Sequence, residues 1–559
     1  MIGVVAEPHD HPMVGEFFEL FKTPWELYER GRSYDVVIVS SRDVPPVNAR
    51  LIVVYGSDIK NLDSQSVATC TRQEGGTLCD GEQHLPVYGK LLTFAKDSSG
   101  APFLDTSSGA AGLTIVRNGS TIKRLGYDLF QEVRFLLSSG QPNEHAHIPT
   151  LDLHIAMLRR WILEAGVALL EIPPAPAGHG FAACLTHDID FTGIRNHRFD
   201  HTMWGFLYRS TIGALPSVAR RRITLTRLLK MWGAAVSLPL VYLKLMKDFW
   251  EPFDWYLRVD GELPATYFLI PFRGRAGARV SSLHPSRRAA GYDIADLGDR
   301  FAALEQAGCE IGVHGIDAWH SADQGRQERI RVAAVADVPA DGIRMHWLLR
   351  DANTASVLEE AGYTYDASLG YNDAIGFLNG TAQAFRPSGT RSLLELPLHI
   401  QDGALFYPRT LDLSEADARI RCDAVVDRVR RFGGVVTVLW HDRSHGPERF
   451  WGGFYISLLE SLKTRGAWFG TAAQVIAWFR QRRAVRFERS REGAGATIRL
   501  EHRGAEIRPP LNIRIHRRSA GREAVTDLCW SGQATVEVNT AEHVEDTRLL
   551  PLDPVCVPS

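Results

Sequence analysis

The chain of 559 residues is too long for one hydrophobic core, so we expect about two to four domains. Its 63 Lys and Arg nearly balance its 65 Asp and Glu, which gives no global electrostatic reason to bind nucleic acid. The seven cysteines form no Cys-x-x-Cys pair, which argues against a cysteine zinc site and a dense disulfide framework. The first residues lack a basic segment followed by a long apolar run, so we expect a cytoplasmic protein.

Residues 1–150 are expected to form a separate α/β domain whose role the sequence does not indicate. Apolar runs at 35–41, 49–56 and 85–94 predict buried strands. No glycine-rich phosphate loop follows any of them, so we assign no nucleotide site here. A helix predicted over 150–166 then leads into a proline-rich linker.

The segment 175–482 alternates predicted helices with short apolar runs. Helices predicted over 292–308, 351–363 and 414–434 carry glycine at their ends, and each precedes an apolar run. This alternation predicts a parallel sheet, and seven such strands indicate a barrel. The predicted strands lie in FAACLTHDID, PATYFLIP, CEIGVHGID, DGIRMHW, TYDASLG, LLELPLHI and GVVTVLWHD.

Polar residues gather at or just past the ends of these predicted strands, where barrel enzymes carry their chemistry. They are Asp188, Asp190, His314, Arg344, His346, Asp366, His399 and His441. Asp188 and Asp190 are two residues apart on a strand, so their carboxylates point the same way and repel each other. A cation beside them would remove that cost.

A divalent metal ion would account for this pair, and zinc is the expected ion. Catalytic zinc sites take three protein ligands from imidazole nitrogen and carboxylate oxygen. Asp190, His314 and His320 are the predicted ligands, with Asp317 competing with His320 for the third position. His320 comes six residues after His314, not the four that place two side chains on one helix face, so it must return over a loop.

In their order along the chain, these motifs resemble the polysaccharide deacetylase superfamily (NodB homology, carbohydrate esterase family 4) over about residues 180–480. THDID resembles the first family motif, which implies Asp188 as general base and Asp190 as metal ligand. VHGIDAWH resembles the second motif, with its two metal histidines, but has two extra residues between them. The family fold is a distorted (β/α)7-type barrel, which agrees with the number of predicted strands.

The remaining motifs supply the other candidate residues. GIRMHW resembles the third motif, which implies that Arg344 orients the catalytic aspartate; His346 replaces the usual proline and is expected in the substrate groove. YDASLGYND occupies the place of the fourth motif, and Asp366 or Asp373 could pair with Arg344. TVLWHD resembles the last motif, which implies His441 as general acid.

The resemblance implies a metal-dependent hydrolase that removes N-acetyl, or alternatively O-acetyl, groups from a sugar residue of a glycan. Trp319, Trp347 and Trp440 adjoin motif residues and are candidates either to stack on sugar rings or to belong to the core. Two other interpretations stay open. An Asp-x-Asp glycosyltransferase would need only THDID, and the departures at His320 and His346 also fit an inactive glycan-binding barrel.

Two further segments have their own expectations. The long stretch at about 192–260 holds Arg220, Arg221, Arg222 and an uncharged run over 231–243 that is too short to span a bilayer. We expect a helical insertion that packs on the barrel or, alternatively, peripheral contact of 220–250 with an anionic inner membrane. Over 485–559, alternating apolar and polar residues predict a small β-sandwich without a catalytic cluster.

Overall fold

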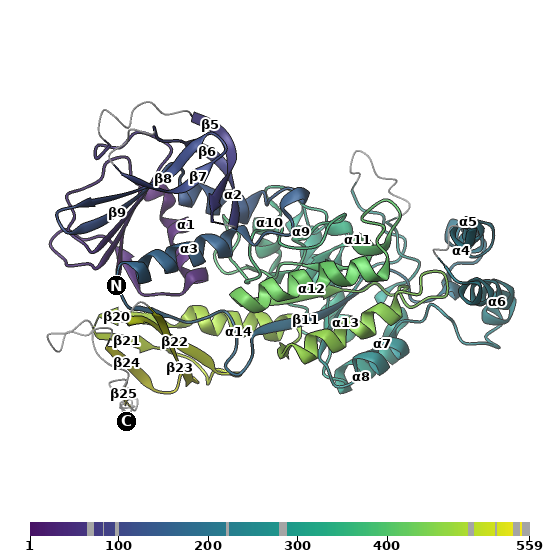
Figure 1. Ribbon diagram of the computed structural model, residues 1–559. Coiled ribbons are helices and arrows are strands. Elements are labelled where there is room, and N and C mark those ends of the chain that lie inside the picture. The colour runs from purple at the N-terminus through teal and green to yellow at the C-terminus, as the bar shows by residue number, and fades with distance from the viewer. Residues whose placement is uncertain are drawn as a thin grey trace, which may run out of the picture.

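The computed structural model describes residues 1–63, 72–81, 83–95, 100–219, 223–278, 288–489, 497–519, 522–539 and 548–550. Figure 1 shows an N-terminal domain and two small C-terminal sheets at one end of the molecule, a central α/β barrel, and helices α4–α6 at the opposite end.

The N-terminal domain has one nine-stranded sheet with three helices packed on it. Five neighbouring strands are parallel and the others extend the sheet in antiparallel fashion, in the order β2-β1-β3-β4-β9-β8-β7-β5-β6. The three strands and the helix predicted from sequence are present. The strands are β1 (Ile2–Val5), β2 (Trp25–Leu27), β3 (Val36–Val39), β4 (Leu51–Tyr55), β5 (Arg72–Asp80), β6 (Gln83–Leu92), β7 (Ala101–Thr106), β8 (Gly109–Arg117) and β9 (Ser120–Leu125); the helices are α1 (His11–Phe21), α2 (Leu129–Ser138) and α3 (Thr150–Glu164).

The central sheet is parallel, and its strands follow one another around a barrel in the order β16-β15-β14-β13-β12-β11-β18-β17. The predicted sixth strand is split into two short strands, β16 and β17, which do not pair with each other, so the described barrel is open between them. A ninth strand, β19 (Ala467–Phe469), pairs with the start of β11. The eight barrel strands are β11 (Phe181–Ile189), β12 (Ala265–Leu269), β13 (Glu310–Gly315), β14 (Gly342–Met345), β15 (Tyr365–Asp366), β16 (Leu394–Glu395), β17 (Ile400–Gln401) and β18 (Val435–Leu439).

Helices cover the outside of this barrel, and the three that the sequence predicted are among them. A large apolar core between strands and helices holds them in place, as burial of amphipathic faces requires. The helices are α7 (Phe253–Asp260), α8 (Gly298–Gln306), α9 (Ala322–Ala336), α10 (Thr354–Ala361), α11 (Asp402–Phe406), α12 (Glu415–Phe432), α13 (Gly452–Thr464) and α14 (Ala472–Ala484).

The strand register explains why polar side chains meet inside one end of the barrel. Ile189, Leu269, Val313 and Ile343 stand side by side on four neighbouring strands and face the helices in the apolar core. Because side chains alternate along a strand, the next row points into the barrel. His314 and Arg344 are paired in that row, and Asp190 continues it directly after β11.

The C-terminal region forms two antiparallel sheets with a shared apolar core, of the orders β10-β22-β23 and β20-β21-β24-β25. One strand of the first sheet, β10 (Leu169–Glu171), comes from the chain before the barrel. The region therefore depends on a segment outside the predicted 485–559. Its other strands are β20 (Arg486–Arg489), β21 (Thr497–Glu501), β22 (Leu511–Ser519), β23 (Arg522–Trp530), β24 (Thr535–Asn539) and β25 (Arg548–Leu550).

The segment between β11 and β12 is helical, as expected from the sequence, and begins at the end of the barrel where the polar row lies. Its helices are α4 (His201–Ser210), α5 (Leu215–Ala219) and α6 (Leu225–Tyr242), which project from the barrel, followed by α7. Among the described residues, no helix is both long and apolar enough to cross a membrane. Arg220, Arg221 and Arg222 lie outside the described residues.

Candidate metal centre and active site

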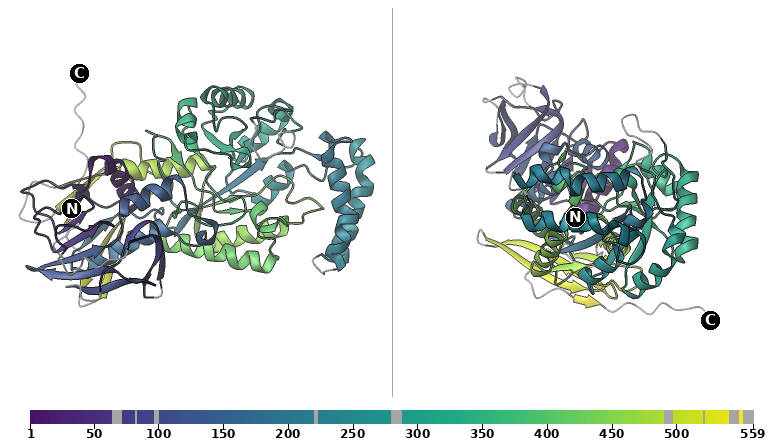
Figure 2. Two further views of the ribbon diagram at one scale, coloured as in Figure 1. Left: turned by 90° about the horizontal axis from the view of Figure 1, so that it is seen from above. Right: turned by 90° about the vertical axis from the view of Figure 1, so that its right-hand side faces the viewer.

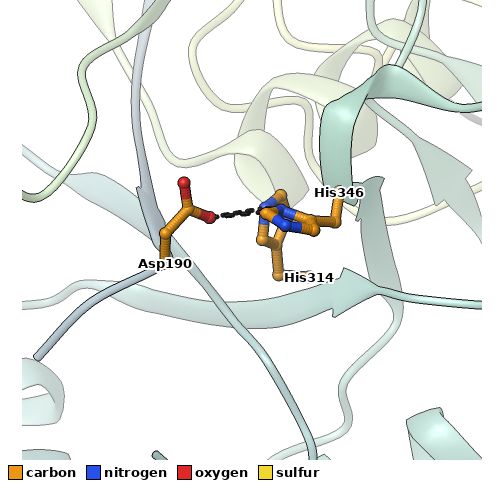
Figure 3. A group of neighbouring side chains, drawn as sticks. All are labelled: Asp190, His314 and His346. Carbon is orange, nitrogen blue, oxygen red and sulfur yellow. Dashed lines mark hydrogen bonds and ion pairs between the residues drawn. The ribbon is translucent and has the colours of Figure 1, made fainter. Parts of the chain in front are cut away.

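Asp190, His314 and His346 bring three potential metal ligands to one point at the strand ends (Figure 3). Asp190 Oδ1 lies 3.3 Å from His314 Nε2 and 3.2 Å from His346 Nδ1, and the two imidazole nitrogens are 3.0 Å apart. Tetrahedral zinc with bonds of about 2.0–2.2 Å separates neighbouring ligand atoms by about 3.3–3.6 Å, close to this spacing. Asp190 Oδ1 is buried without a hydrogen bond, so this donor set fits a divalent cation.

The pKa values of Asp190 and His346 are both shifted from their ordinary values. Burial opposes ionisation of Asp190, but His346 and His314 more than offset it and hold the pKa of this carboxyl well below its usual range. Burial lowers the pKa of His346 below its ordinary value, although Asp190 acts in the opposite direction. A carboxylate beside a neutral imidazole is the form that binds metal.

The backbone fixes both histidines. His314 Nδ1 lies 3.0 Å from the carbonyl oxygen of Arg344, an arrangement that turns Nε2 toward the other two ligand atoms. His346 directly follows β14, and the next residue, Trp347, has φ of 65°, in the left-handed region that bulky residues rarely adopt. Such backbone strain is typical of functional sites.

His320 does not take part in this ligand group, contrary to the expectation from sequence. It lies in the loop after β13, where its Nε2 is 3.4 Å from Asp317 Oδ1. That loop is anchored by Glu328 of α9, which accepts hydrogen bonds from the backbone N–H groups of Ile316 and Asp317. The carboxylate of Asp317, the other candidate, accepts a hydrogen bond from the Ala278 N–H. His346, expected in the substrate groove, occupies the third position instead.

Arg344 forms its ion pair with Asp188, and from the fourth motif it contacts the backbone, where its Nε donates a hydrogen bond to the carbonyl oxygen of Ala367. Its Nη1 lies 3.2 Å from Asp188 Oδ1 and donates to Thr186 Oγ1 at 2.5 Å, and both members of the ion pair are buried. The other carboxylate oxygen, Asp188 Oδ2, is 3.8 Å from His314 Nε2 and therefore faces the ligand group. The arginine thus holds Asp188 beside the candidate metal centre.

Asp366 and Asp373 have different surroundings. Asp366 stands opposite Glu395 on β16 and accepts hydrogen bonds from the N–H and hydroxyl of Ser368. Burial raises the pKa of Asp366 to about 6, and it raises the pKa of Glu395 well above the usual range, with the Asp366 charge adding to it. Asp373 is exposed and lines a separate cavity of about 580 Å³. Neither forms an ion pair with Arg344 in the described structure.

His441 is joined to a carboxylate that the sequence motifs did not identify. Its Nδ1 lies 2.5 Å from Asp402 Oδ1, and its backbone N–H donates to Asp402 Oδ2 at 2.8 Å. Burial acts to lower the pKa of His441, but the charge of Asp402 and its hydrogen bond outweigh it and raise the pKa to about 10. Asp402 directly follows β17. Its position just past a strand end is the feature by which the sequence could have indicated a functional role.

Asp442 adds a further carboxyl group to this end of the barrel. Its side chain accepts hydrogen bonds from the N–H groups of Phe191 and Arg443. Burial, followed by the charge of Asp190, raises the pKa of Asp442 to about 7. It stands directly after His441 in the last motif.

Other candidates from the sequence have core positions. Trp440 is fully buried and stacks with Phe454, so its indole belongs to the core. Trp319 is half-buried against the same core. His399 is buried and receives the backbone N–H of Thr437, and burial lowers its pKa to about 4, which marks a structural histidine.

A groove of about 1130 Å³ lies between the helical insertion and the barrel, close to the loop that carries His441. Arg443, two residues after His441, lines it and places its guanidinium 3.8 Å from the ring centre of Phe191, the neighbour of Asp190. Aromatic side chains of Tyr407 and Trp451 also line this groove. These residues offer stacking faces and donors close to the loop that carries His441.

Comparison with known proteins found similarity to solved structures, at low identity. No family model and no curated protein matches the chain. Among solved structures, a putative polysaccharide deacetylase from Mycobacterium smegmatis is 19% identical, with a TM-score of 0.34 over 58% of this chain and 100% of that one. A probable polysaccharide deacetylase from Pseudomonas aeruginosa PAO1 is 14% identical, with a TM-score of 0.34 over 56% and 94%.

A third similar structure is a CE4 family pseudoenzyme from Bacillus anthracis. It is 12% identical, with a TM-score of 0.25 over 54% of this chain and 69% of that one. Because all three TM-scores are low, we assign roles only from the contacts of this chain.

Proposed function

We propose that this chain is a metal-dependent hydrolase that removes N-acetyl groups from a sugar residue of a glycan. The observation that carries the proposal is the meeting of three groups at the strand ends of one barrel. These are the ligand group Asp190, His314 and His346, the Asp188–Arg344 ion pair, and the His441–Asp402 pair.

In this proposal Asp190, His314 and His346 hold the metal ion, with zinc expected from their nitrogen and oxygen donors. A divalent ion bound there would supply a Lewis acid that polarises the acetyl oxygen and makes water more acidic. His346, which stands where the third motif usually has proline, thereby takes the ligand position that was expected for His320 of the second motif.

Asp188 is the proposed general base. Arg344 binds its Oδ1, which leaves Oδ2 facing the ligand group and free to accept the proton of an attacking water.

His441 is the proposed general acid. Its Nδ1 is engaged by Asp402, so Nε2 is the atom that can give a proton to the departing amine. With a pKa of about 10, this imidazole carries that proton at neutral pH. Amide hydrolysis needs such a donor because an unprotonated amine is a poor leaving group.

The groove beside the insertion is the proposed position of the glycan. Tyr407 and Trp451 can stack on sugar rings, and Arg443 and Arg449 can donate to hydroxyl or acidic groups. Of the two roles considered for Trp319 and Trp440, stacking on sugar or packing in the core, their contacts with the apolar core favour the second.

An acetate-release assay across N-acetylated glycans, with and without chelator, tests the proposal. We expect release that chelator abolishes and zinc restores, and none from the Asp190→Ala variant. Metal binding without acetate release from any glycan would instead support an inactive glycan-binding barrel. Binding of a nucleotide sugar in calorimetry, again without acetate release, would support a glycosyltransferase.

A further inference from the structure

The insertion carries a stripe of apolar side chains that face solvent. On α6 and the residue after it, six large apolar side chains recur every three or four residues, which places them on one face of the helix. Their exposed fractions run from 41% to 80%. This stripe consists of Leu225, Leu229, Trp232, Val236, Leu240 and Leu243.

This stripe is not the face by which α6 packs on the protein. Leu228, Met231, Leu238 and Val241 of the same helix are buried. Leu238 and Val241 pack with residues of α4 and with Trp250, so α6 already buries one apolar face. The remaining large side chains stay in water, which costs free energy unless something covers them.

Exposed apolar side chains extend beyond α6 across the insertion. Trp204 of α4 is 57% exposed, and Leu245 and Met246, in the turn after α6, are 71% and 45% exposed. Figure 2 shows the insertion helices at the end of the molecule, away from the N-terminal domain and the C-terminal sheets. The apolar surface is therefore reachable by a large, flat partner.

The charge of this segment is strongly one-sided. Residues 201–247 contain eight Lys and Arg and no Asp or Glu, although acidic and basic residues are nearly balanced over the whole chain. Lys230 and Lys244, within α6 and after it, are exposed. The eight are Arg209, Arg220, Arg221, Arg222, Arg227, Lys230, Lys244 and Lys247.

We infer that the α4–α6 insertion docks on the surface of an anionic lipid bilayer. Exposed apolar side chains with basic neighbours are the composition that binds the interface between headgroups and acyl chains. A second copy of the chain would fit less well, because residues 201–247 of both copies carry Lys and Arg but no Asp or Glu.

The insertion is also fixed to the active-site end of the barrel. Asp248 accepts hydrogen bonds from the N–H groups of Ile194 and Arg195, which follow Asp188 and Asp190 along the chain. Trp250 donates from Nε1 to Glu448, in the loop after His441. Docking would therefore bring the catalytic groove to the membrane surface, where a lipid-anchored glycan could enter it.

Co-sedimentation of the full chain with vesicles tests the inference. We expect binding to vesicles of phosphatidylcholine and phosphatidylglycerol, and much weaker binding to phosphatidylcholine alone. The variant Leu229→Glu/Val236→Glu/Leu243→Glu should lose binding to the anionic vesicles. Lys230→Glu/Lys244→Glu should weaken it by at least about tenfold, because each basic residue near an anionic surface contributes about fivefold.

A matched control carries the same number of substitutions on exposed aliphatic residues elsewhere, Ile330→Glu/Ile420→Glu/Ile456→Glu, and should bind as the unaltered chain does. Circular dichroism should show equal folding of all variants. Equal binding by the α6 variant and the control would overturn the inference. So would a dimer in sedimentation velocity that the α6 substitutions dissociate, without vesicle binding. Neither readout depends on deacetylase activity, so failure here leaves the proposed function standing.

Discussion

His320 lies in the loop after β13, and His346 directly follows β14. Only His346 reaches the ligand group. His320 lies in a loop that Glu328 holds from α9, and it meets Asp317 at the surface. His346 comes directly after β14 and lies 3.2 Å from Asp190. A residue next to a strand end is thus held more firmly than one farther along a loop, because β14 is paired with β13 and β15 on its two sides.

Replacing His346, directly after β14, should have the largest effect on zinc affinity. We expect His346→Ala to lower zinc affinity by more than about 100-fold, because even an outer-shell partner of a metal ligand contributes about 10- to 100-fold. Acetate release should fall with it. Zinc titration against a fluorescent chelator measures the change, and a variant that keeps native affinity would remove His346 from the site.

The next effect separates Asp188, in β11, from Asp190, directly after it. Asp188→Asn should lower turnover by about 10²–10⁴-fold while zinc binding survives, since a general base contributes in that range. Asp190→Ala should lose metal and activity together. Metal content by elemental analysis, measured beside acetate release, distinguishes them; equal metal loss in both variants would contradict the division of roles.

A change of pH dependence should follow from removing the partner of His441. Asp402 raises the pKa of His441 to about 10, so the proton of the general acid is present below that pH and lost as pH rises through it. Asp402→Asn should move the alkaline limb of the rate profile toward the ordinary histidine value of about 6.5. At pH 8 the rate should drop by about tenfold or more. An unchanged alkaline limb would exclude His441 as the acid.

The smallest effect is expected in the loop after β13. His320→Ala should alter zinc affinity and turnover by no more than about twofold, as is usual for exposed side chains that contact no essential group. Measured with His346→Ala in the same assays, it is the matched control for the comparison. A large loss in both variants would mean that the loop moves onto the metal.

Much of the barrel and part of the site were predictable because they follow local rules. Alternating helices and strands predicted the parallel sheet, and the ends of parallel strands share one edge, which brought Asp188, Asp190, His314 and His441 together. The split of LLELPLHI into β16 and β17 was not predictable, since each pairs for only two residues and on opposite sides of the opening. The strand β10 was not predictable either, because its antiparallel partner β22 is remote in sequence.

By itself, the sequence determined which side chains stand at strand ends and which face of each strand they occupy, because side-chain alternation is a property of the extended backbone. Which of them meet depends on the tertiary structure. The register between β13 and β14 and the turn at Trp347 bring His346 to Asp190 and His314, and the pairing of β17 with β18 brings Asp402 next to His441. These pairings depend on how remote strands are packed, which no local pattern records.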